Sequence, residues 1–113
     1  MIQITQNFNL EEFSCPCCGF NVINYFLVHR LQVVRDIIGI PMHVLSGCRC
    51  QKHNNEVGGK PESQHLLGNA CDWTIEDYSM NHSSLLLHEW SGGFHFYPGD
   101  NFIHTDVGLK RRW

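Results

Sequence analysis

One segment of the chain carries apolar residues at the spacing of an amphipathic helix. Over residues 24–38 they recur at i, i+4, i+7 and i+11: Leu27, Leu31, Val34 and Ile38. Asn24 is a suitable N-terminal cap, because its short side chain can accept a hydrogen bond from the first turn. Gly39 and Pro41 follow the last apolar position and are typical helix stops. The pattern therefore predicts a helix over residues 24–38.

Shorter apolar stretches bounded by turn residues predict strands and brief helices. The expected strands cover residues 42–46, 70–74, 94–97 and 102–107. The last two are joined by Pro98-Gly99-Asp100-Asn101, a turn sequence that predicts a hairpin. Short helices are expected over residues 10–13 (capped by Asn9), 50–57 and 83–90. This order favours an α+β fold, with a small antiparallel sheet and helices packed on one face.

Side chains alternate between the two faces of a strand, and this places the polar residues of the sheet. In the last long strand His104 lies on the same face as Phe102 and Asp106. Asp72 shares a face with its alternate neighbours, whereas Cys71 and Trp73 point the other way into the core. The alternation predicts a polar site on one face of the sheet.

Composition narrows the class of protein. The chain has 113 residues, 42% of them hydrophobic and 12% aromatic, which predicts one domain spanning residues 1–113 with a modest core. A net charge of −3 argues against nucleic-acid binding. The sequence shows no apolar run long enough for a membrane span and no signal-peptide pattern. We expect a monomer that is made in the cytoplasm.

Five residues form the pattern S-x-H-x-x-G-x-A-x-D: Ser63, His65, Gly68, Ala70 and Asp72. A separate stretch, FIHTD, supplies His104. Two histidines and one carboxylate are a known ligand set for catalytic zinc, which keeps a fourth position open. Zinc at such a site activates water and polarises a carbonyl group. We therefore predict His65, Asp72 and His104 as zinc ligands on the sheet.

The opposing interpretation is that these histidines are ordinary. The chain has eight histidines, and a single histidine is more often a surface or core residue than a metal ligand. Five residue types at fixed offsets, joined by a second histidine on a separate apolar segment, are much harder to obtain by chance. The metal interpretation is therefore preferred.

The same stretches resemble the zinc D-alanyl-D-alanine carboxypeptidase family of metallopeptidases, which includes phage endolysins. The resemblance runs from about Phe8 to Trp113 and is closest to short, compact members. It is carried by NFNLEEF, SGCRC, HNNEVGG, SQHLLGNACDW, FIHTDVG and RRW. It implies a zinc-dependent peptidase that cuts stem or cross-bridge peptides of bacterial peptidoglycan. It also implies an origin in a phage or prophage and delivery to the wall by other factors.

The resemblance also suggests catalytic residues. Arg49 matches an arginine that meets the substrate carbonyl or carboxylate in similar enzymes. Many members carry an acid three residues before the last histidine ligand, but this chain has Asn101 there. Asp106 is the first candidate for the general base, followed by Asp100 and then His95. Asp106 has an alternative role, which is to orient a metal-binding histidine.

Six cysteines are many for this length, and five of them form the groups C-P-C-C and C-R-C: Cys15, Cys17, Cys18, Cys48 and Cys50. Four of these thiols could hold a structural zinc, and the spacing leaves open which four. Free thiols or a disulfide are the alternatives, although a reducing compartment disfavours a disulfide. Cys71 is expected to be a core thiol.

A second class of function stays open. Without an acid at Asn101, the chain could be a non-catalytic, zinc-containing module that binds the cell wall or has a structural role. The sequence also leaves open which peptide bond is cut and whether the cut is internal or carboxy-terminal, because fold membership does not determine these details.

Overall fold

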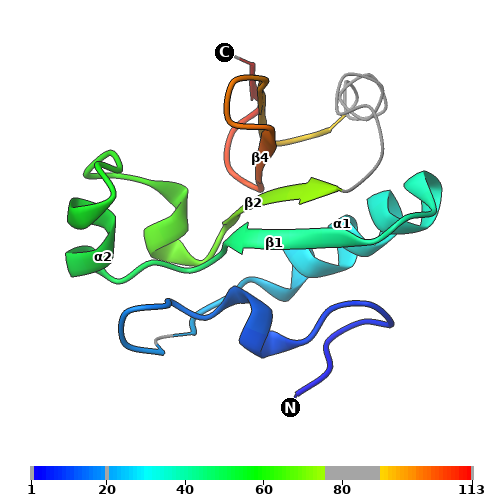
Figure 1. Cartoon of the computed structure of the whole chain (residues 1–113), viewed down its shortest axis with the longest axis horizontal. Helices are drawn as coiled ribbons and strands as arrows, with labels where there is room; N and C mark the ends of the chain where they lie inside the picture. The colour runs from blue at the N-terminus through cyan, green and yellow to red at the C-terminus, as the bar shows by residue number, and fades with distance from the viewer. Residues whose placement is uncertain (1, 20, 76–89, 113) are drawn as a thin grey trace.

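A five-stranded sheet forms the centre of the fold (Figure 1). The computed structural model describes residues 2–19, 21–75 and 90–112. The strands are β1 (Met42–Ser46), β2 (Ala70–Ile75), β3 (Gly93–Tyr97), β4 (Phe102–Asp106) and β5 (Arg111–Arg112). Their order is β1-β2-β4-β3-β5, and every pairing is antiparallel except that of β3 with β5. The predicted α+β class and the hairpin of β3 and β4 are confirmed.

Helix α1 (Tyr25–Ile38) is the predicted long helix. Asn24 caps it by accepting a hydrogen bond from the Phe26 amide, and Gly39 ends it in the left-handed conformation with φ of 77°. Its apolar stripe is buried, with Leu27 and Leu31 fully inaccessible to solvent. This stripe packs against the strand residues Trp73 and Ile103, so α1 provides one wall of the hydrophobic core.

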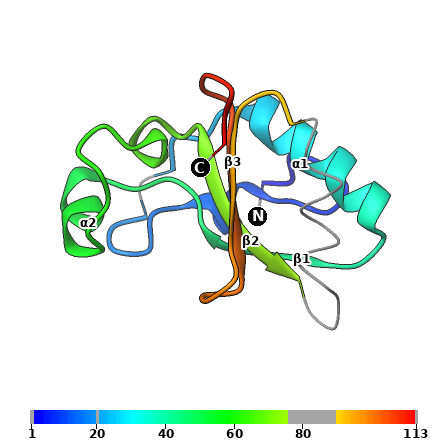
Figure 2. The ribbon, with the colours of Figure 1, turned by 90° about the horizontal axis from the view of Figure 1, so that it is seen from above.

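Three short helices complete the described elements: η1 (Leu10–Phe13), α2 (Gln51–Glu56) and η2 (Gln64–Leu67). Asn9 and Glu12 form a capping box on η1, which confirms the predicted cap. Figure 2 shows α1 and α2 on opposite sides of the sheet, which differs from the predicted packing of the helices on one face. The helix predicted over residues 83–90 lies outside the described residues, except for Trp90.

The hydrophobic core does not extend under the whole chain. It joins η1, α1 and the inner strands, and among the described residues it takes none from residues 47–69. Those residues include α2 and η2, which lie at the opposite end of the molecule from the C-terminal end of α1 (Figure 1). Val57 and Leu67 are more than half exposed there. Contacts other than apolar packing must therefore hold this segment in place.

The register of β2 and β4 places the polar site. Asp72 lies directly opposite His104, and Ala70 lies opposite Asp106. Directly opposed residues share a face of the sheet. The alternate residues Cys71, Trp73 and Ile103 belong to the core, as the period of two predicted. No helix among the described residues combines the length and apolar character needed to cross a bilayer.

Candidate functional site

The three predicted metal ligands converge on one point. Asp72 Oδ1 lies 3.3 Å from His65 Nε2 and 2.8 Å from His104 Nδ1. One donor atom from each of the three residues lies within 4.8 Å of the other two. The imidazole rings meet edge to face, with centroids 5.3 Å apart. Two nitrogens and a carboxylate oxygen facing one another form the donor set that suits a zinc ion.

His65 is fixed by the short helix η2. Its Nδ1–H donates to the Gly47 carbonyl oxygen at 2.6 Å, which leaves Nε2 facing Asp72. Gly68 ends η2 with φ of 72°, and a side chain there would collide with the Val22 carbonyl. A glycine is therefore required for the chain to turn from His65 into β2. This explains the glycine of the motif in structural terms.

His104 lies between two carboxylates. Its Nδ1 faces Asp72 and its Nε2 is 2.8 Å from Asp106 Oδ2. A histidine that binds metal through one nitrogen commonly donates its other N–H to a carboxylate, which fixes the ring. The contact with Asp106 fits that pattern and leaves Nδ1 as the nitrogen available to a cation.

The local charges shift the pKa values of the cluster. Burial opposes ionisation of Asp72, but hydrogen bonds from His104 and His65 outweigh it and hold its pKa well below the usual range. Burial disfavours the charged form of His104, but hydrogen bonds to Asp106 and Asp72 outweigh it and raise its pKa. The metal-free cluster thus favours a positive charge on His104, which a bound cation would replace.

Asp106 is fully buried, and its acceptor positions are occupied. Oδ1 accepts from the backbone amides of Gly93 at 2.9 Å and Gly108 at 3.0 Å. Oδ2 accepts from His104 and forms an ion pair with Arg111. Despite burial, these bonds lower the pKa of Asp106, with the bond from His104 contributing most. The contacts favour the orienting role for Asp106, and the identity of the general base stays a prediction.

Arg49 reaches the same cluster from the segment after β1. Its Nε donates to Ser46 at 3.2 Å and Nη1 donates to Asn54 at 3.3 Å. Its Nη2 lies 3.4 Å from Asp72 Oδ2. The side chain is only 13% exposed, so the guanidinium group is held in a defined position beside the predicted ligands. That placement agrees with the predicted contact to a substrate oxygen, which stays a prediction.

A pocket of about 920 Å³ opens over the cluster. Its lining includes all three predicted ligands and the predicted catalytic residues Arg49, Asp106 and Asp100. Asp100 belongs to the turn between β3 and β4, where Asn101 has φ of 53°. His95 lies opposite His104 on β3. The wall on the α2 side is formed by residues 57–64.

Sequence reasoning assigned no role to two residues that support this pocket. Asn54 on α2 is fully buried, accepts from Arg49 and donates to the Lys60 carbonyl at 2.9 Å. Arg111 lines the pocket and pairs with Asp106. The polar HNN stretch was the sequence feature that could have indicated a supporting role for Asn54. Arg111 and Asp106 lie five residues apart, across the turn between β4 and β5, and no spacing rule indicated the pair.

The cysteines divide into two groups. The thiols of Cys15, Cys17, Cys18 and Cys50 gather within 4.8 Å of one another. Cys48 and Cys71 are buried elsewhere, Cys71 in the hydrophobic core as predicted. The sequence left open which four of the five cysteines could share a metal ion, and the fold brings these four together.

Comparisons with known proteins agree with the geometry. The sequence matches the family described as Peptidase M15 over residues 6–106. It is 35% identical over 95 residues to the peptidoglycan L,D-endopeptidase MepK of Escherichia coli K12, and equally to that of Shigella flexneri. Each alignment covers 77% of this chain and 52% of the relative, so the chain spans about half the length of these curated relatives.

Proposed function

The chain belongs to the peptidase M15 family, and from this membership we propose that it is a zinc-dependent peptidase that hydrolyses peptide bonds of bacterial peptidoglycan. One observation carries the proposal. His65, Asp72 and His104 offer donor atoms within 4.8 Å of one another, in the lining of a pocket that Arg49 also lines.

The residues fit a catalytic zinc in their chemistry. His65 and His104 each use one ring nitrogen to contact a fixed acceptor, Gly47 or Asp106, and turn the other toward Asp72. Three protein ligands leave one position for water or substrate. When bound, zinc would polarise the scissile carbonyl and make water a better nucleophile at neutral pH.

The protein residues around this position have separate roles in the proposal. Arg49 binds a carbonyl or carboxylate oxygen of the substrate, for which a planar guanidinium group is suited. Asp106 is a positioning residue that holds the His104 ring. Asp100, at the pocket rim, is then the first candidate for the general base, and His95 is the next.

The substrate follows from the relatives. The MepK proteins are named as peptidoglycan L,D-endopeptidases, which makes an internal L,D bond the first to test. We propose the same substrate class for this chain. A phage or prophage origin and delivery to the wall by other factors stay predictions from the sequence resemblance.

The test is digestion of purified peptidoglycan, with and without a zinc chelator. New amino groups and shortened muropeptides, identified by mass spectrometry, are expected only without chelator. The position of each new terminus distinguishes an internal cut from removal of a terminal D-alanine. His104→Ala is the matched inactive control. Binding to the wall without any released fragment would instead support a non-catalytic wall-binding module.

A further inference from the structure

Among the described residues, the segment of residues 47–69 buries Cys48 at its start but contributes no side chain to the main hydrophobic cluster. It nevertheless carries Arg49 and one wall of the pocket. Small folds that cannot hold a segment by apolar packing commonly use a disulfide or a metal ion instead. Within the described residues, this segment adds one thiol to the cluster formed with the N-terminal region, that of Cys50, the N-cap residue of α2.

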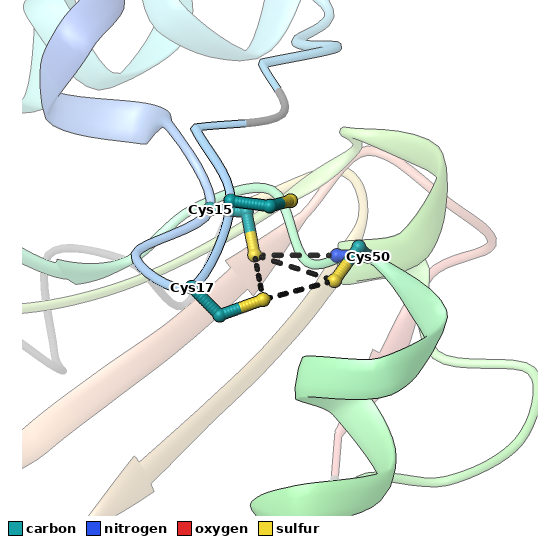
Figure 3. A group of neighbouring side chains, drawn as sticks. Cys15, Cys17 and Cys50 are labelled. Carbon is teal, nitrogen blue, oxygen red and sulfur yellow. Dashed lines mark hydrogen bonds between the residues drawn. The ribbon is translucent and has the colours of Figure 1, made fainter.

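Figure 3 shows the thiols of Cys15, Cys17 and Cys50 pointing toward one another. Their sulfur atoms are separated by 3.6 Å (Cys15 to Cys17), 3.7 Å (Cys15 to Cys50) and 3.2 Å (Cys17 to Cys50). Ligands at the usual Zn–S length of about 2.3 Å in a tetrahedron lie about 3.8 Å apart. A disulfide requires about 2.05 Å. The spacing is therefore near that of a shared metal and far from that of a bond.

Cys18 completes the set, because its sulfur lies within 4.8 Å of the other three. We propose that Cys15, Cys17, Cys18 and Cys50 bind a structural zinc ion, separate from the His65 site. Four thiolates fill a tetrahedral shell and leave no open position, which is the signature of a structural site. Three of the ligands come from a tight turn and the fourth from a distant segment of the chain.

Backbone amides donate hydrogen bonds to the sulfur atoms of the cluster. The Cys50 amide donates to Cys15 Sγ at 3.5 Å, and the His53 amide donates to Cys50 Sγ at 3.4 Å. Such donors offset the negative charge that four thiolates bring to a dication, and they orient the sulfur atoms. The Gly19 amide also donates to the Cys15 carbonyl at 2.8 Å, which closes the turn that carries three of the ligands.

Cys48 is excluded although it lies only two residues before Cys50. It is fully buried, and its backbone amide donates to the Phe13 carbonyl at 2.8 Å. Its thiol is not among those that gather within reach of a common ion. Because Cys48 and Cys50 lie in the same C-R-C stretch, they form a matched pair for mutation.

A metal at this position would tie residues 15–18 to the start of α2. Arg49 immediately precedes Cys50, and its guanidinium group contacts both Asn54 and Asp72. The ion would therefore fix the segment from which Arg49 and the pocket wall at residues 57–64 extend. Closing a long loop in this way also restricts the unfolded chain.

The test measures zinc in the full chain, purified under reducing conditions without chelator. The variant His65→Ala/His104→Ala removes the first site, so the metal that remains reports on the thiols alone. We expect about one zinc per chain in this background. Adding Cys50→Ser should remove it, and adding Cys48→Ser should leave it. Cys17→Ser, at an exposed position, repeats the test without disturbing a buried side chain.

Cobalt replacement gives a second measurement that does not depend on activity. Cobalt bound by thiolates absorbs strongly in the near ultraviolet through charge transfer from sulfur, and a site of histidine and carboxylate ligands does not. The band should persist in His65→Ala/His104→Ala and disappear in Cys17→Ser. Zinc content unchanged by both Cys17→Ser and Cys50→Ser would overturn the proposal. So would a disulfide between these cysteines in the reduced-purified protein, found by thiol counting.

Discussion

The His65–Asp72–His104 cluster and the four-thiol cluster differ in what holds them in place. In the first, β2 and β4 set the register of Asp72 against His104, and each histidine is anchored by its second nitrogen. In the second, the sulfur atoms contact mainly one another and nearby backbone amides, at the edge of a segment that adds no side chain to the main hydrophobic cluster.

The difference teaches what each metal would contribute. The fold preorganises the first cluster, so an ion there would contribute mainly to catalysis and little to the stability of the fold. The thiol cluster has no comparable scaffold, so an ion there would mainly stabilise the local structure. Its four thiolate ligands would leave no open coordination position for substrate or water. The two sites are therefore expected to separate cleanly, one affecting activity and the other affecting the stability of residues 47–69.

The largest expected effect is the loss of activity when a ligand of the first cluster is removed. His65→Ala and His104→Ala should each reduce peptidoglycan cleavage to background, because two remaining ligands hold zinc poorly. Each should also lower zinc content by about one ion per chain while the thiol site stays loaded. His29→Ala, an exposed position on α1, is the matched control. Unchanged zinc in both site variants would contradict the ligand assignment.

The second effect is a loss of folding stability when a chelator removes zinc, and it should be concentrated in residues 47–69. If free zinc normally exceeds its dissociation constant about a thousandfold, its removal should cost about 4 kcal/mol of unfolding free energy. Hydrogen exchange should rise most over residues 47–69, which contribute no side chain to the main hydrophobic cluster, and least in β2 and β4. A matched experiment on Cys50→Ser should show high exchange before chelator is added. Equal increases in both regions would remove the distinction between the two clusters.

Some determinants of the first cluster are local, and these follow from the sequence. The period of two fixed the face of His104, and the motif containing Gly68 brought His65 to the start of β2. The helix cap at Asn24 and the capping box at Asn9 also follow from short-range hydrogen bonds. In the two caps the residue and its partner lie within a few positions, so spacing rules apply, whereas His104 meets Asp72 across 32 positions through the pairing of β2 with β4.

The thiol cluster shows where sequence reasoning stops. Cys48 and Cys50 have the same residue type and nearly the same position, and only the packing of residues 47–50 against η1 separates them. The Cys48 amide donates a hydrogen bond to the Phe13 carbonyl, which leaves Cys50 facing the turn at residues 15–18. The role of Asp106 was likewise undecided, because its contacts with Gly93 and Arg111 depend on the third dimension.

The third effect concerns Asp106 and tests whether it helps to hold the His104 ring in position for metal binding. As the positioning residue of His104, Asp106→Asn should weaken zinc binding at the first site by roughly 10–100-fold. If Asp106 is the general base, turnover should fall by about 10²–10⁴-fold with normal zinc content. Zinc titration and single-turnover cleavage distinguish the two roles. Asp100→Asn is the comparison variant, and a larger loss of turnover there would assign the base to the turn.

The fourth effect links the two clusters through Arg49, which adjoins Cys50 and contacts Asp72. Arg49→Lys keeps the charge but loses the planar group. Cleavage should fall by about 10–100-fold, equivalent to a charged hydrogen bond of about 1.5–3 kcal/mol, while both zinc ions stay bound. Arg35→Lys on α1 is the matched control. Full activity of Arg49→Lys would show that this guanidinium group does not bind substrate.

The smallest effect expected is a pH dependence of stability that has opposite signs in the two metal-free clusters. The pKa of His104 is raised in the folded protein, so its charged form contributes stability that is present below its unfolded pKa and is lost as pH rises through the folded pKa. For Cys15, burial opposes ionisation, but hydrogen bonds from the Cys50 and Cys17 amides and from neighbouring thiols lower its pKa to about 6. That thiol therefore contributes stability at higher pH, which is lost as pH falls through its folded value.

Urea unfolding of the chelated protein between about pH 6 and pH 8 measures the sum of these contributions, and a variant separates them. The thiols are unchanged in His104→Gln, so the difference between the parent and this variant reports on His104 together with His95, whose pKa is lowered by burial and by the charge of His104. That difference should decrease as pH rises, by no more than about 1.4 kcal/mol per pH unit for one proton. Asp72 and Asp106 also face His104, but their lowered pKa values place their own titration at acidic pH, outside this range. Parallel pH profiles for the parent and the variant would show that the first cluster does not hold a proton in place of its cation, and would weaken the claim that the fold preorganises it.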